Sequence, residues 1–160
     1  MKKPYPLPAS DASPGTVWFG GPISWFSITL SIRADDLDPD EVTRLLGVVP
    51  HVAQRKGVWL TTRNEHGRMT EFGMWSIVLR REDTTEWDIE AAIGMLLDRI
   101  PATIEAWHSA RANARARIFV GLTIDTSNRG FGLSPDLMGR LAEFGLDLDF
   151  DIYNEQADTT

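Results

Sequence analysis

The alternation of apolar and polar residues is the feature of this 160-residue sequence that most constrains its fold. Four stretches carry it: Phe26–Ile32, Trp75–Leu79, Ile118–Ile124 and Leu146–Ile152. Successive side chains of a strand point to opposite faces, so each stretch predicts a strand with one buried and one polar face. A weaker fifth strand, Gly57–Thr62, is expected to form a hairpin with the strand near Trp75 across the turn Asn64–Gly67.

Apolar residues at helical spacing occupy segments between these strands and predict four helices. The expected helices cover Val42–Val49, Ile89–Ile100, Ile104–Arg111 and Met138–Phe144. The first and last begin alike, because Asp38 and Ser134 each precede a proline and can cap the free backbone N–H groups. The chain is therefore predicted as two strand-helix-strand halves, a repeat that chance or a shared capping solution explains as well as duplication does.

These elements predict an α+β fold, namely a mostly antiparallel sheet with helices on one face. Buried parallel strands are usually apolar on both faces, whereas each of these strands has one apolar and one polar face. A ferredoxin-like or related two-layer sandwich is the expected architecture. The expected domain covers residues 25–154, between a proline- and glycine-rich tail (1–24) and a short polar tail (155–160).

Charge and cysteine content exclude several kinds of chemistry. The chain has no cysteine, which excludes disulfides and thiolate metal sites. Its net charge of -7 argues against general binding to nucleic acid or to an anionic membrane, since both require a surplus of basic residues. Prolines interrupt the apolar run that a signal peptide needs, so we expect a soluble cytoplasmic protein.

Several short motifs occur in an order that resembles a known family. They are Leu37-Asp38-Pro39-Asp40-Glu41-Val42-Thr43, Leu46-Gly47 with Pro50, Arg55-Lys56-Gly57, Gly73 with Trp75, Gly132-Leu133-Ser134-Pro135, and Leu148-Asp149-Phe150-Asp151-Ile152-Tyr153. Together they resemble a mainly bacterial family catalogued as domain-of-unknown-function family 4279, from about Phe26 to Tyr153. The resemblance implies a shared fold and brings no established activity, cofactor or catalytic set.

Basic residues between His51 and Arg81 suggest a recognition surface. Six basic side chains face only two acidic ones there, and tryptophans lie among them. The candidate binding residues are Arg55, Lys56, Trp59, Trp75 and Arg80. Arginine and tryptophan are enriched at protein interfaces. The leading interpretation is a non-catalytic module that binds a protein, including regulatory or immunity-type roles, although these arginines could instead pair with the chain's own acids.

Two further interpretations remain. Asp147, Asp149 and Asp151 share one face of the last strand and could hold Mg²⁺ or Ca²⁺ in a metal-dependent enzyme, or they could form a solvated face that blocks strand pairing. A homodimer formed through an edge strand or the polar sheet face is the other alternative. The three histidines have neither metal-ligand spacing nor a nucleophile partner, so no catalytic set and no cofactor are expected.

Overall fold

Five strands form one sheet in the computed structural model, which describes residues 23, 25–60, 67–83, 88–124 and 131–154. The strands are β1 (Trp25–Ala34), β2 (Val52–Gln54), β5 (Gly73–Arg80), β6 (Arg115–Ile124) and β7 (Asp147–Asn154). Two further strands, β3 (Trp59–Leu60) and β4 (Arg68–Met69), pair only with each other. We call this two-stranded sheet and its base, residues 55–60 and 67–70, the arm.

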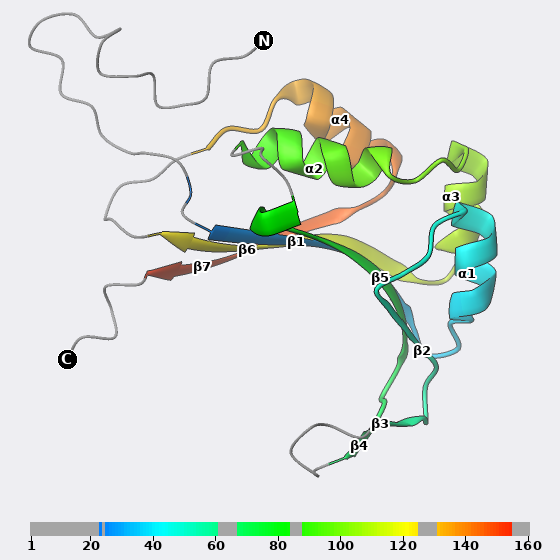
Figure 1. Ribbon diagram of the computed structural model, residues 1–160. Coiled ribbons are helices and arrows are strands. Elements are labelled where there is room, and N and C mark those ends of the chain that lie inside the picture. Colours follow the sequence, from blue (N-terminus) through cyan, green and yellow to red (C-terminus); the bar gives the residue numbers. More distant parts are fainter. Residues whose placement is uncertain (1–22, 24, 61–66, 84–87, 125–130, 155–160) are drawn as a thin grey trace, which may run out of the picture.

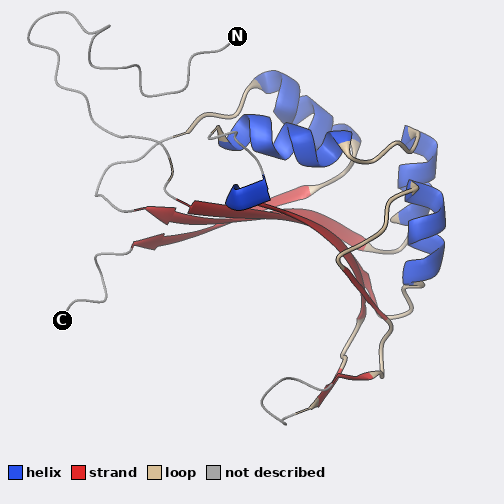
Figure 2. Ribbon diagram, in the orientation of Figure 1, coloured by secondary structure: helices blue, strands red, loops and turns tan. Residues whose placement is uncertain are grey.

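The four α-helices of the described residues lie on one face of the sheet (Figure 1). They are α1 (Pro39–Leu46), α2 (Ile89–Asp98), α3 (Ile104–Ala110) and α4 (Pro135–Glu143), and a 3-10 helix η2 (Arg81–Asp83) follows β5. The sheet bends so that its helix-free face is concave, and the arm projects from the end that carries β2 and β5 (Figure 2). The expected α+β fold, with helices on one face of a mostly antiparallel sheet, is confirmed.

The strand order β2-β5-β1-β6-β7 includes one parallel pair within the mostly antiparallel sheet. β1 pairs antiparallel with β5 and with β6, and β2 pairs antiparallel with β5. β7 runs parallel to β6 after the crossover through α4. The two strand-helix-strand halves therefore differ, since β5 separates β1 from β2 whereas β6 and β7 are neighbours. A ferredoxin-like arrangement specifically is not confirmed.

The alternation predicted the buried face correctly in the inner strands. In β1, Phe26, Ile28, Leu30 and Ile32 are all fully buried under the helices. At the sheet edge, by contrast, Ile152 of β7 is 56% exposed, because coverage decreases towards the end of that strand. The alternation of β7 thus reflects coverage by helices on one side only, and it carries no information about strand direction.

Both predicted helix starts are capped as expected. Asp38 Oδ1 accepts a hydrogen bond from the backbone N–H of Asp40 at 3.0 Å, and Ser134 Oγ accepts one from that of Leu137 at 3.2 Å. A proline follows each capping residue at the start of the helix. Side-chain caps satisfy N–H groups that have no partner inside the helix, so they fix where α1 and α4 begin.

The structure differs from the sequence-based expectations at three places. Within the strand expected at Gly57–Thr62, β3 pairs with β4 and not with the strand that carries Trp75, because the chain passes through β4 before it enters β5. Residues 61–66, which include most of the expected turn, lie outside the described residues. The short edge strand β2 was missed, since three residues are too few to show an alternating pattern. Met138 was expected on the buried face of its helix, but it is half exposed and Leu137 is buried instead.

Tryptophans occupy the core as well as the surface, and a matched pair of substitutions distinguishes the two. Trp75 is fully buried and its Nε1–H donates to Thr43 Oγ1 at 3.0 Å, whereas Trp59 is 62% exposed. We expect Trp75→Ala to lower the free energy of unfolding by about 3–5 kcal/mol. Trp59→Ala should change it by less than about 0.5 kcal/mol. Urea denaturation followed by circular dichroism measures both, and equal losses would contradict this placement.

Candidate recognition surface

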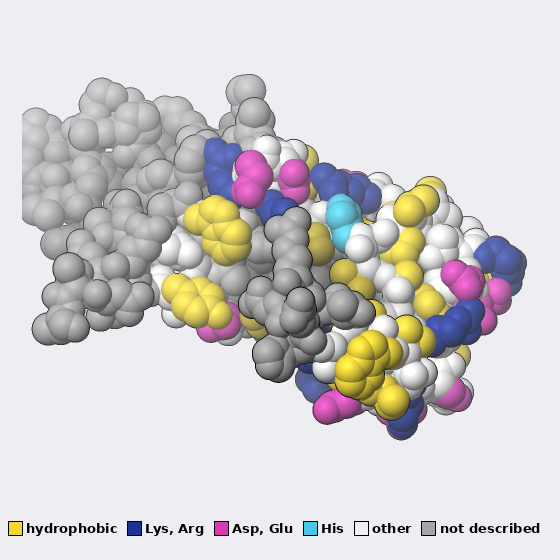
Figure 3. All heavy atoms as spheres, turned by 60° about the horizontal axis from the view of Figure 1, so that its bottom comes forward, with side chains coloured by type: hydrophobic (Ala, Val, Ile, Leu, Met, Phe, Trp, Pro, Cys, Tyr) yellow, Lys and Arg dark blue, Asp and Glu magenta, His cyan; other side chains and the backbone are white. Residues whose placement is uncertain are grey.

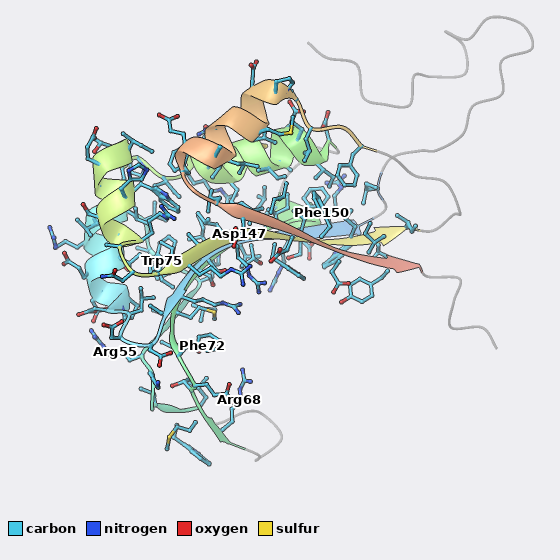
Figure 4. All side chains as sticks on the ribbon, turned by 180° about the vertical axis from the view of Figure 1, so that it is seen from behind. Arg55, Arg68, Phe72, Trp75, Asp147 and Phe150 are labelled. Carbon is cyan, nitrogen blue, oxygen red and sulfur yellow. The ribbon has the colours of Figure 1, made fainter. Side chains whose placement is uncertain are left out.

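Arg55 and Lys56 bind acidic residues at the start of α1. The Arg55 guanidinium donates to Asp38 at 2.6 Å and to Asp40 at 2.7 Å, and the Lys56 ammonium pairs with Asp35. These contacts join the base of the arm to the loop between β1 and α1, where Figure 4 shows Arg55. The two basic side chains are therefore neutralised by the chain itself, and their direct effect is to hold the arm in place.

Thr70 fixes the base of the arm from within. This buried side chain accepts a hydrogen bond from the backbone N–H of Val58 at 2.9 Å and donates one to the carbonyl oxygen of Arg55 at 2.6 Å. Its own backbone exchanges hydrogen bonds with Gly57 and Val58. Because these bonds join both strands of the arm, they define its orientation at the base.

The arm exposes a pair of large apolar side chains. Trp59 and Met69 stand opposite each other in the β3–β4 register and are 62% and 59% exposed. The indole of Trp59 lies across Gly67, where an added Cβ would be 2.2 Å from Nε1. A glycine at this position therefore lets the indole rest against the backbone.

The remaining candidate residues lie apart from this pair. Trp75 lies between the sheet and the helices (Figure 4), fully buried, where it cannot touch a partner. Arg80 is exposed at the end of β5 on the concave face, since it stands opposite Ser27 of β1. Among the described residues, neither Arg80 nor Arg68 of the arm has an ion-pair partner for its side chain. The structure thus brings together only Arg55, Lys56 and Trp59 of the five candidates.

The three aspartates of β7 each have their own partner. Arg115 donates to Asp147 at 2.7 Å, and Arg117 donates to Asp149 at 2.9 Å. Asp151 accepts a hydrogen bond from the hydroxyl of Tyr153, two residues along the strand. Within the described ranges, no three metal-binding side chains converge. Arginines neutralise the carboxylates of Asp147 and Asp149, so a metal ion would have to compete with these arginines for the same oxygens.

The outer edge of β5 is closed by side chains beyond the short strand β2. His51 Nδ1 accepts a hydrogen bond from the backbone N–H of Val78 at 3.0 Å, and Asp83 accepts one from the backbone N–H of Arg80 at 2.8 Å. Arg99 donates to the carbonyl oxygen of Val78. These contacts occupy groups that a further strand would need, so this edge is protected against strand addition.

Sequence reasoning missed a cluster on the concave face, where Ser31 and Arg33 of β1 lie beside Arg117 of β6. Figure 3 looks towards this face and shows basic, acidic and apolar side chains interspersed. The signal was present in the sequence, since Ser31 and Arg33 alternate with the core residues Leu30 and Ile32. Their neighbours on other strands became visible only in the fold.

A comparison with known families finds a match over most of the chain. A family model described as a domain of unknown function, DUF4279, matches residues 24–155. No curated protein and no solved structure matches the chain. Among the helices that the structure describes, none has the length and apolar character needed to cross a bilayer.

The contact between Arg55 and Asp38 predicts a pH-dependent stability. The hydrogen bond from Arg55 is the main cause that lowers the pKa of the Asp38 carboxyl, and backbone N–H groups of Asp40 and Glu41 lower it further. A carboxyl with a lowered folded pKa stabilises the fold above its unfolded pKa of about 3.9, and the effect is lost as the pH falls through the folded value.

We therefore expect Arg55→Gln to raise the pKa of Asp38 and to lower stability at neutral pH, with the difference shrinking below about pH 4. Carboxyl ¹³C NMR of Asp38 and urea denaturation at several pH values measure these effects. Arg44→Gln is the matched control, because Arg44 pairs with Glu41 and not with Asp38. An unchanged Asp38 titration in Arg55→Gln would contradict the contact.

Proposed function

The chain belongs to the DUF4279 family, and we propose that it is a non-catalytic module that recognises another protein through the arm. The observation that carries this proposal is the exposed cross-strand pair of Trp59 and Met69. A tryptophan that is mostly exposed loses much of the stabilisation that burial would provide. Tryptophan is also the residue type most typical of the few side chains that dominate binding energy at protein interfaces.

The arm is prepared for binding by contacts that the chain makes with itself. The ion pairs of Arg55 and Lys56 fix its base, and Gly67 provides a flat support for the indole of Trp59. A side chain that is already oriented loses less conformational entropy when a partner covers it. In this proposal Arg55 and Lys56 position the arm, and Trp59 makes the direct contact.

Charge indicates an acidic surface on the partner. Residues 55–69 contain four basic side chains and only one acidic one, although the whole chain has a net charge of -7. Arg68, next to Met69, has no acidic partner among the described residues. Figure 4 shows its side chain at the arm, away from the helices. Positive charge around an apolar centre favours a partner that carries acidic residues around an apolar pocket.

The test is affinity capture followed by measurement on the purified partner. We expect a protein that binds the wild-type chain to bind Trp59→Ala at least tenfold more weakly, as typical of a dominant interface residue. Gly67→Ala should also weaken binding, because the added methyl group displaces the indole without changing any charge. Raising the salt concentration should weaken binding further by screening the basic residues.

The matched control is Met138→Ala, which removes a half-exposed apolar side chain from α4 on the helix layer. Binding of the partner should be unchanged in this variant. The same affinity for wild type and Trp59→Ala would refute the arm as the recognition surface. Capture of single-stranded nucleic acid in place of a protein would refute protein recognition, since tryptophan and arginine can also stack on bases.

A further inference from the structure

Three arginines lie close together on the concave face, and only two of them have acidic partners. Arg33 of β1 stands opposite Arg115 of β6, and Arg117 lies two residues further along β6. Arg115 pairs with Asp147 and Arg117 pairs with Asp149. No carboxylate in the described part of the chain pairs with Arg33. The cluster therefore has one positive charge that its own acids do not neutralise.

Arg33 is held in a fixed orientation by an aromatic ring. Its guanidinium carbon lies 5.2 Å from the centre of the Phe72 ring. Of the three guanidinium nitrogens of Arg33, only Nε is both buried and without a hydrogen-bond partner. Partial burial lowers the pKa of the Arg33 guanidinium, and the charges of Arg117 and Arg115 lower it further.

Three polar atoms in this cluster are buried without a hydrogen-bond partner. They are Ser31 Oγ, Arg33 Nε and Arg117 Nε. Ser31 is 1% exposed, and it stands on β1 directly opposite Arg117 and two residues before Arg33. Buried polar groups are nearly always hydrogen-bonded in folded proteins, and all three of these atoms can donate. The cluster is thus short of acceptor oxygens and of negative charge at the same place.

We propose that Ser31, Arg33 and Arg117 form a binding site for a carboxylate group. A carboxylate has two oxygens with about four acceptor positions, enough for the donors that lack partners. Its single negative charge matches the single unneutralised positive charge. The planar guanidinium of Arg33 also fits a carboxylate through two parallel hydrogen bonds. This site rests on different residues from the arm, so it does not depend on the function proposed above.

A phosphate group fits the cluster less well than a carboxylate. At neutral pH inorganic phosphate carries between one and two negative charges, which exceeds the single charge to be neutralised. The carboxylates of Asp147 and Asp149 lie on the same face and would repel the additional charge. The ligand can be a free small carboxylate or an aspartate or glutamate side chain of a peptide, because both present the same group.

The site can be tested by NMR on the full-length chain, using the Arg33 Nε–H signal. Acetate is added in place of chloride at constant ionic strength. The Arg33 Nε–H signal should then shift with acetate concentration and reach saturation in the millimolar range. Arg33→Lys keeps the charge but removes the planar fork, and we expect acetate binding, followed at the Ser31 amide, to weaken at least tenfold. Arg80→Lys is the matched control on the same face and should bind as the wild type does.

Ser31→Ala separates binding from stability. The substitution removes a buried hydroxyl that has no partner, so the melting temperature should not fall, whereas acetate binding should weaken several-fold. An unmoved Arg33 signal, an equal response to chloride, or full binding in Arg33→Lys would overturn the proposal. A stronger saturable response to inorganic phosphate than to acetate would overturn the carboxylate assignment.

A capped pentaglutamate peptide distinguishes the two sources of the carboxylate, with capped pentaglutamine as its uncharged control. A shift of the Arg33 signal with pentaglutamate at lower concentration than with acetate supports the site and assigns it to an acidic peptide. Saturable binding of acetate without a response to pentaglutamate supports the site and assigns it to a small free carboxylate. Equal responses to pentaglutamate and pentaglutamine would contradict recognition of the carboxylate.

Discussion

Burial of one face of the sheet under four helices is the constraint on which the rest of the structure depends. The inner strands place fully buried side chains such as Phe26, Leu30 and Ile118 under this layer, and the gain from removing them from water holds the helices in place. In the part of the chain that the structure describes, no helix covers the opposite face (Figure 2). On this face Arg115 and Arg117 form ion pairs with two aspartates of β7, whereas Ser31 Oγ and Arg33 Nε have no hydrogen-bond partner among the described residues.

Local patterns predicted the elements and their buried faces, but they did not predict strand direction or pairing. β7 illustrates the difference. Its alternation correctly indicated a strand with two unlike faces, yet the same pattern is produced by an antiparallel strand and by a parallel strand covered on one side. The strand partner predicted for Gly57–Thr62 was wrong for a related reason. Several nearby segments could pair with this strand, and the sequence does not show which of them does.

The candidate surface was predictable in part. The same alternation that buries Ile77 and Leu79 also buries Trp75, so its position in the core could have been inferred from the sequence alone. The pairing of Arg55 with Asp38 could not, since 17 residues separate them and only the fold brings them together. The sequence shows how many charged residues a segment contains. Binding depends on which of these residues lack an oppositely charged partner in the folded chain.

The distribution of those charges explains why an acidic ligand would approach the concave side. The four helices contain seven acidic residues and only two arginines, so the helix layer carries much of the negative charge of the chain. Among the described residues, Arg33, Arg68 and Arg80 have no acidic partner and lie on the concave face or on the arm beside it. Arg99 and Arg111, at the ends of α2 and α3, also have none. Three of these five arginines therefore favour the approach of an acidic partner to the concave side. Apolar contact at Trp59 and a carboxylate near Arg33 then become two independent contributions to recognition on that side.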